Sequence, residues 1–114
     1  MLSTQQIARF ARDGYLILPG LADTALCRQI VADTRQWLAQ DRQPIEYEAD
    51  VDYPGSPASR AAEGGLTARR LLQAYSRSSL LQQWATGPAL AQPLLQLLGP
   101  GAMLAQAHHN CIMT

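Results

Sequence analysis

Residues 104–114 read Leu-Ala-Gln-Ala-His-His-Asn-Cys-Ile-Met-Thr, a pattern that predicts a β-strand with polar side chains on one face. Successive strand residues point to opposite faces, so the polar face holds Leu104, Gln106, His108, Asn110 and Ile112. Two amides and an imidazole between aliphatic residues are typical of the inner wall of a ligand-binding barrel. The alternative interpretation is a strand whose polar face meets solvent.

The composition indicates one globular domain without a charge bias. The chain has 114 residues, of which 47% are apolar and 16% charged. Nine basic and nine acidic side chains cancel, which removes the electrostatic case for binding nucleic acid or an anionic membrane surface. No secretory signal or transmembrane stretch is apparent, and Cys27 and Cys111 lack the spacing of a disulfide framework. We therefore expect a cytoplasmic location and reduced thiols.

A capped helix followed by a short strand is predicted at the N-terminus. Ser3 and Gln6 have the spacing of a capping box, in which each side chain binds a backbone N–H of the other residue. Gly14 is suited to end this helix in a left-handed conformation. The apolar run at 15–18 precedes Pro19-Gly20 and predicts a brief strand before a turn.

A second helix is predicted to begin at a cap provided by Asp23 or Thr24 and to end at about Gln40. Its apolar stripe is formed by Leu26, Ile30, Thr34, Trp37 and Leu38. Prolines, glycines and alternating carboxylates then predict a long loop at 41–65, which could serve as a lid, with a β-like stretch at 45–51. The acidic alternation offers oxygen ligands for calcium, but the register of a calcium-binding loop is absent.

Residues 66–98 are predicted to be helical. Ser79 and Gln82 repeat the capping-box spacing ahead of a leucine-rich segment. Gly87-Pro88 separates this helix from the next, and Pro93 either kinks the last helix or marks its start.

The predicted sheet is too small to be stable by itself. One short strand and one long strand cannot form an independent sheet, and an unpaired strand of apolar residues would promote aggregation. We therefore expect further strands beyond residue 114. The expected organisation is one N-terminal part of a larger domain, with a helical region at 1–40, a loop or lid at 41–65, a helical region at 66–98 and a barrel strand at 102–114.

The residues of the terminal strand do not form a complete catalytic or metal site. His108 and His109 point to opposite faces of a strand and cannot bind the same metal ion without a bulge. With Asn110 they imitate the His-x-Asp of an iron site, but an amide is a poor substitute for the carboxylate. Cys111 would need an adjacent base to act as a nucleophile, and a packed thiol is the simpler interpretation. No metal ligand or catalytic residue is predicted.

Three segments together suggest a family. They are residues 13–21, which read Asp-Gly-Tyr-Leu-Ile-Leu-Pro-Gly-Leu, the segment from Pro88 to Gly99, and the strand carrying Gln106 and Asn110. This combination resembles the start of phytanoyl-CoA dioxygenase-like proteins, and the resemblance covers nearly the whole chain.

The resemblance implies a non-haem iron(II), 2-oxoglutarate-dependent oxygenase of the α+β class that hydroxylates a small molecule. Its N-terminal helices would pack outside a double-stranded β-helix, a jelly-roll or cupin-like barrel of which this chain holds only the first strands. By this resemblance Asn110 and Gln106 would contact the 2-oxoglutarate co-substrate, and Gln106 and His108 would face the substrate. The family's iron ligands and its arginine for 2-oxoglutarate lie further downstream, so the 114 residues alone are predicted to be inactive.

A hypothesis from a different class is a small helical interaction module or a truncated remnant without catalytic activity. Such a chain would present its leucine stripes or its terminal strand to a partner and would form a defined dimer.

Overall fold

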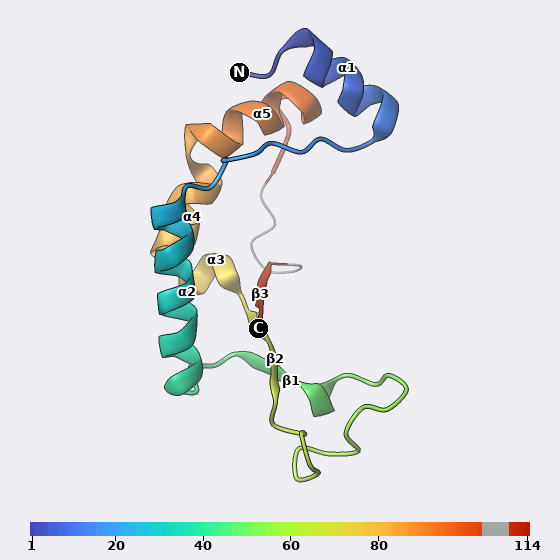
Figure 1. Cartoon of the computed structure of the whole chain (residues 1–114), viewed down its shortest axis with the longest axis vertical. Helices are drawn as coiled ribbons and strands as arrows, with labels where there is room; N and C mark the ends of the chain where they lie inside the picture. Colours follow the sequence, from blue (N-terminus) through green and yellow to red (C-terminus); the bar gives the residue numbers. More distant parts are fainter. Residues whose placement is uncertain (104–109) are drawn as a thin grey trace.

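The computed structural model describes residues 1–103 and 110–114 and has the predicted α+β class. Its helices are α1 (Thr4–Asp13), α2 (Thr24–Ala39), α3 (Ala74–Arg77), α4 (Ser79–Thr86) and α5 (Pro88–Leu98), shown in Figure 1. The described strands are β1 (Ile45–Tyr47), β2 (Ala68–Leu72) and β3 (Cys111–Met113), and the 3-10 turn η1 (Glu48–Asp50) follows β1.

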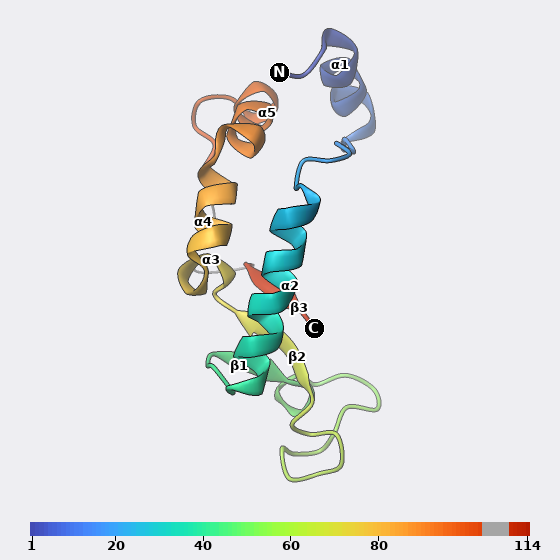
Figure 2. The same ribbon diagram turned by 60° about the vertical axis from the view of Figure 1, so that its left-hand side comes forward.

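The molecule is elongated, with extents of 53 × 31 × 24 Å. Helices α1 and α5 lie at one end, α2 runs beside α3 and α4 through the middle, and the sheet and the loop that follows η1 lie at the other end (Figures 1 and 2). The radius of gyration is 17.4 Å, whereas a compact domain of this length has a value of about 13 Å. The chain therefore exposes much surface for its size.

The three strands form an antiparallel sheet in the order β1-β2-β3. Leu71 at the centre of β2 lies opposite Ile45 on one side and Ile112 on the other. The register shifts between Glu46 and Tyr47, so that Arg69 is an extra residue on β2, as in a β-bulge.

The core lies between the sheet and the C-terminal half of α2. Leu71 is fully buried, and Trp37 of α2, Ile45 and Tyr47 pack around it. Ile112 is partly buried and also packs against this cluster. We expected the strand face that includes Ile112 to line a ligand pocket, but at this position it contributes to the core.

Both predicted N-terminal caps are confirmed. Ser3 and Gln6 form the complete capping box, and Gly14 ends α1 in the left-handed conformation. The Asp23 side chain accepts a hydrogen bond of 2.7 Å from the backbone N–H of Leu26. Helix α2 ends at Ala39, and its predicted stripe is its least exposed side apart from Asp33.

Residues 15–18 were predicted to form a strand, and this prediction is wrong. The run has no regular secondary structure, and Tyr15 and Ile17 are 57% and 74% exposed. A strand is stabilised by pairing with a neighbour, and the described sheet is formed by other segments at the opposite end of the molecule.

The prediction of helix throughout 66–98 is also wrong in its first part, because residues 68–72 form β2, the central strand. Cross-strand pairs on both sides of β2 outweigh its local pattern. Later in this region Ser78, rather than Ser79, caps α4 by accepting a hydrogen bond from the N–H of Leu81. Pro93 lies inside α5 and does not start it.

The predicted strand at 102–114 is confirmed only at Cys111–Met113. Ala102 and Met103 are not in a strand, because the chain turns at Gly99-Pro100-Gly101 and has no pairing partner there. Residues 104–109 lie outside the described part of the chain.

Candidate functional site

Asn110 is the one predicted site residue that lies among the described residues, and it joins β3 to the start of α3. Its backbone carbonyl accepts a hydrogen bond of 3.2 Å from the N–H of Ala74. Its side-chain Oδ1 accepts one of 3.0 Å from the N–H of Tyr75. Gln73, which precedes the helix, makes no capping hydrogen bond with its side chain. Asn110 therefore provides acceptors that the first N–H groups of a helix require.

Tyr75 is also held from the other side. Nε2 of Gln82 in α4 donates a hydrogen bond of 2.7 Å to the carbonyl of Tyr75. The junction of β2 and α3 is thus fixed by contacts from β3 and from α4, and the orientation of the Asn110 side chain is defined by this junction. Gln106 and His108, the other two predicted site residues, lie outside the described residues.

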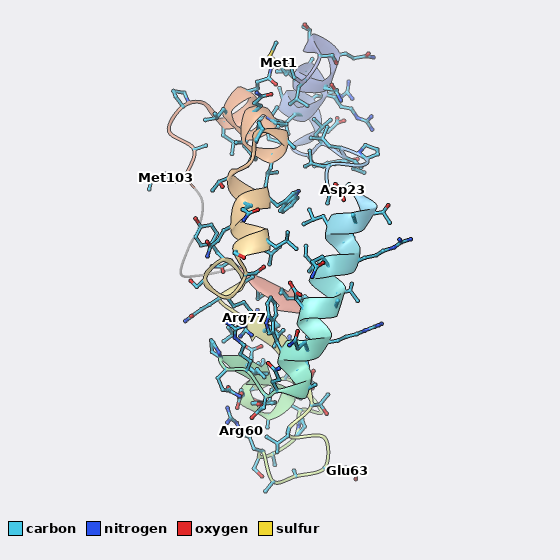
Figure 3. All side chains as sticks on the ribbon, turned by 90° about the vertical axis from the view of Figure 1, so that its left-hand side faces the viewer. Met1, Asp23, Arg60, Glu63, Arg77 and Met103 are labelled. Carbon is cyan, nitrogen blue, oxygen red and sulfur yellow. The ribbon has the colours of Figure 1, made fainter. Side chains whose placement is uncertain are left out.

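Arg77 lies near this junction and makes three side-chain hydrogen bonds. It was not among the residues predicted from the sequence. It is 9% exposed, and its guanidinium donates to three backbone carbonyls, those of Leu72 (2.9 Å), Arg42 (3.0 Å) and Pro44 (2.6 Å). Figure 3 shows Arg77 beside the lower half of α2, and its guanidinium carbon lies 5.6 Å from the ring centre of Trp37.

The contacts of Arg77 connect the segment after α2, the start of β1 and the end of β2. Burial lowers the pKa of the guanidinium below its usual value, but hydrogen bonds from the charged donor to three backbone carbonyls compensate for such burial. We conclude that Arg77 positions α3, and through α3 the contact with Asn110.

A second group of polar side chains connects β1, η1 and β2, and we call it the carboxylate–arginine cluster: Glu46, Glu48, Tyr53, Arg69 and Arg70. Glu46 accepts two hydrogen bonds, of 2.8 and 2.6 Å, from Arg70. Arg69 Nε lies 3.4 Å from Glu46, and its Nη1 lies 3.7 Å from Glu48. Tyr53 donates its hydroxyl hydrogen to Glu48. The bulge at Arg69 explains how two consecutive arginines reach the same carboxylate.

The predicted loop at 41–65 contains β1 and η1, and the segment that follows η1 is tied to them by a further pair. Asp50 accepts two hydrogen bonds, of 2.8 and 2.9 Å, from Arg60, and the Arg60 guanidinium lies over the ring of Tyr47 at 4.9 Å. Of the four alternating carboxylates at positions 46, 48, 50 and 52, the first three are thus paired with arginine. Among residues 1–103 and 110–114, no group of three or more His, Cys, Asp or Glu side chains is arranged to hold a metal ion.

The carboxylate–arginine cluster makes stability depend on pH. The hydrogen bonds from Arg70 lower the pKa of Glu46, so the ionised carboxylate stabilises the fold at neutral pH, and this contribution is lost as the pH falls from the ordinary pKa of a glutamate through the lowered one. We expect Glu46→Gln to destabilise the protein at pH 7 and to differ progressively less from wild type as the solution is acidified. Urea unfolding at a series of pH values measures this difference.

Glu63→Gln is the matched control, because Glu63 is an exposed loop carboxylate. Its unfolding free energy should remain close to that of wild type at every pH. Equal pH profiles for the two variants would contradict a stabilising role for the pairing of Glu46 with Arg70.

The two cysteines carry free thiols, Cys27 exposed on α2 and Cys111 partly buried on β3. Within the described part of the chain, no helix combines the length and the apolar character needed to cross a membrane.

Comparison of the chain with protein-family models, with curated proteins and with solved structures found no match. The resemblance to phytanoyl-CoA dioxygenase-like proteins stays a prediction from the sequence.

Proposed function

We propose that the chain forms the N-terminal part of an iron(II)- and 2-oxoglutarate-dependent oxygenase domain that acts on a small molecule. The observation that carries the proposal is the position of Asn110, directly before β3, with its side chain oriented by the N–H of Tyr75. A co-substrate pocket requires polar groups held in one orientation by their surroundings. In this proposal Asn110 and Gln106 contact 2-oxoglutarate, and Gln106 and His108 face the substrate.

The sheet is compatible with continuation into a double-stranded β-helix. Strand β3 pairs with β2 on one side only, and it is an edge strand of the described sheet. The backbone groups on the other side of an edge strand are suited to pair with a further strand. The helices precede β1 or lie between β2 and β3 in the sequence. A cytoplasmic location belongs to the same proposal, because free thiols persist in a reducing compartment.

The described residues do not provide the iron site. Three of the four alternating carboxylates, Glu46, Glu48 and Asp50, are paired with arginine. The described part of the chain holds no group of three or more His, Cys, Asp or Glu side chains arranged to bind a metal ion. In keeping with the resemblance, the proposal assigns the iron ligands to residues downstream of these 114, and we derive no catalytic step for this chain.

The test is the formation of succinate from 2-oxoglutarate in the presence of iron(II) and oxygen. We expect no succinate above background from the 114-residue chain, and turnover from a longer protein encoded by the same gene, with a His-x-Asp within a few tens of residues after Thr114. Succinate formation by the chain alone would contradict the placement of the iron ligands. Lack of turnover by a longer protein that contains the motif would contradict the proposed function.

Two substitutions of Asn110 in the longer protein separate its proposed contact from its structural role. Asn110→Asp keeps an oxygen that accepts from the N–H of Tyr75, whereas Asn110→Ala removes it. We expect both variants to raise the KM for 2-oxoglutarate about tenfold or more, since one amide contact in a closed site is worth roughly 1.4 kcal/mol. Only Asn110→Ala should also lower the melting temperature. An unchanged KM in Asn110→Asp would exclude contact with the co-substrate.

A non-catalytic interaction module is the second candidate. It is favoured by the exposed apolar side chains of α5 and the following residues, where Leu95, Leu98 and Met103 are 47%, 61% and 94% exposed.

A further inference from the structure

The C-terminal third of the chain contains no charged side chain. All nine arginines and all nine acidic residues lie between Arg9 and Arg77, and none occurs from Ser78 to Thr114. This segment includes α4, α5 and β3. An exposed protein surface normally carries charges of both signs, so the surface of α4 and α5 differs from that of the rest of the molecule.

One face of α5 is covered by the N-terminus. The backbone N–H of Leu2 donates a hydrogen bond of 2.8 Å to Oε1 of Gln96. Ala89 and Pro93, which lie on the same side of the helix as Gln96, border a depression of about 340 Å³ that residues 1–2 and 18–21 also line. Helix α1 therefore packs on this side of α5 and leaves the other side exposed.

The other side of α5 forms a hollow of about 230 Å³ with the end of α4 and the residues after α5. We call it the α5 patch, and its walls include Leu94, Leu95, Leu98, Ala102 and Met103. Met103 lies on the side of the molecule away from α2 (Figure 3). Sites for small organic ligands usually exceed 300 Å³, so the hollow is better matched to one or two apolar side chains.

The absence of charge limits what can cover the α5 patch. A partner with charged groups at this position would have to bury them without a counter-charge, which is costly. The central parts of protein interfaces are depleted in charged residues and enriched in methionine and aromatic residues. The suitable partner is therefore a protein surface that is itself apolar and uncharged.

We infer that the α5 patch is the interface between two copies of this chain. A second copy brings an equally uncharged surface, so no charge is buried on either side. In this dimer the exposed Leu98 and Met103 side chains of each copy would contact the hollow of the other copy. Such a contact, in which each copy uses the same surface, is that of a two-fold symmetric dimer.

This inference names the partner for the interaction module and does not depend on the oxygenase proposal. The two fail in different experiments, because dimer formation is measured without iron, 2-oxoglutarate or residues beyond Thr114.

Sedimentation equilibrium of the 114-residue chain over a range of concentrations tests the inference. We expect a dimer whose dissociation constant rises at least tenfold in Leu95→Asp, because each copy then buries an unpaired carboxylate in an apolar interface. Leu98→Asp should have the same effect. The matched control is Val31→Asp on α2, because Val31 and Leu95 are both 47% exposed, and its dissociation constant should equal that of wild type.

Circular dichroism establishes that the variants keep the helix content of wild type. A wild-type chain that remains monomeric up to about 1 mM, where even weak specific association is visible, would overturn the inference. A dimer that tolerates both Leu95→Asp and Leu98→Asp, or one that Val31→Asp weakens equally, would overturn the assignment to this surface. Flotation of a monomeric wild-type chain with phosphatidylcholine vesicles would show that lipid, and not a second copy, covers the patch.

Discussion

Replacement of Arg77 by methionine is expected to lower the free energy of unfolding by about 3 kcal/mol or more. Methionine retains a long side chain but removes three donors, so the carbonyls of Arg42, Pro44 and Leu72 lose their charged partner. Hydrogen bonds to charged groups contribute about 1.5–3 kcal/mol each, and unpaired buried acceptors are costly. A loss of this size is a large part of the stability of a small domain. Urea unfolding followed by circular dichroism measures it.

Two further substitutions test the geometry of this contact. Arg77→Lys keeps the charge but places its donors on a single nitrogen, which cannot reach three carbonyls in different segments, so only part of the stability should return. Arg35→Met on the exposed side of α2 is the control and should change the unfolding free energy by less than about 0.5 kcal/mol. If Arg77→Met were as stable as Arg35→Met, the three hydrogen bonds would not hold the segments together.

Leu71→Ala is expected to be similarly destabilising, by about 2–5 kcal/mol. Leu71 is the one described side chain that is completely buried, and it lies between Ile45 and Ile112 at the centre of the sheet. Removing most of its side chain leaves a cavity where all three strands meet, and the few other buried residues cannot fill it. The midpoint of urea or thermal unfolding reports the effect.

Leu66→Ala is the control for this prediction. Leu66 lies just before β2 and is 62% exposed, so the same chemical change should cost less than about 0.5 kcal/mol. Comparable losses of unfolding free energy in the two variants would contradict the prediction that the buried position of Leu71 makes its side chain important for stability.

The sequence predicted best the features that depend on a few neighbouring residues. The capping box of Ser3 and Gln6, the end of α1 at Gly14 and the cap at Asp23 are each determined within one helical turn. The strand β2 could not be predicted in this way. Its identity depends on pairing with residues more than twenty positions away, and its Arg-Arg-Leu-Leu pattern lacks the alternation of a typical strand.

The same reason separates the polar contacts that the sequence indicates from those that it does not. Asn110 was predicted from the resemblance as a co-substrate contact, which stays a prediction, and its hydrogen bond with Tyr75 was not predicted. Arg77 could not be identified, because its partners are backbone carbonyls, which leave no trace in the sequence. The pairing of Glu46 with Arg70 had a detectable signal, since alternating carboxylates in one segment and two adjacent arginines in another are complementary across two strands.

The contact of Asn110 with Tyr75 joins residues 35 positions apart, with α4 and α5 between them in sequence. Because Tyr75 and Asn110 anchor both ends of this segment near the sheet, a change in the length of the segment need not alter the register of the strands. The entropy of closing a longer loop rises only slowly with its length. A change in chain length at the turn Gly99-Pro100-Gly101 should therefore leave the register between β2 and β3 intact.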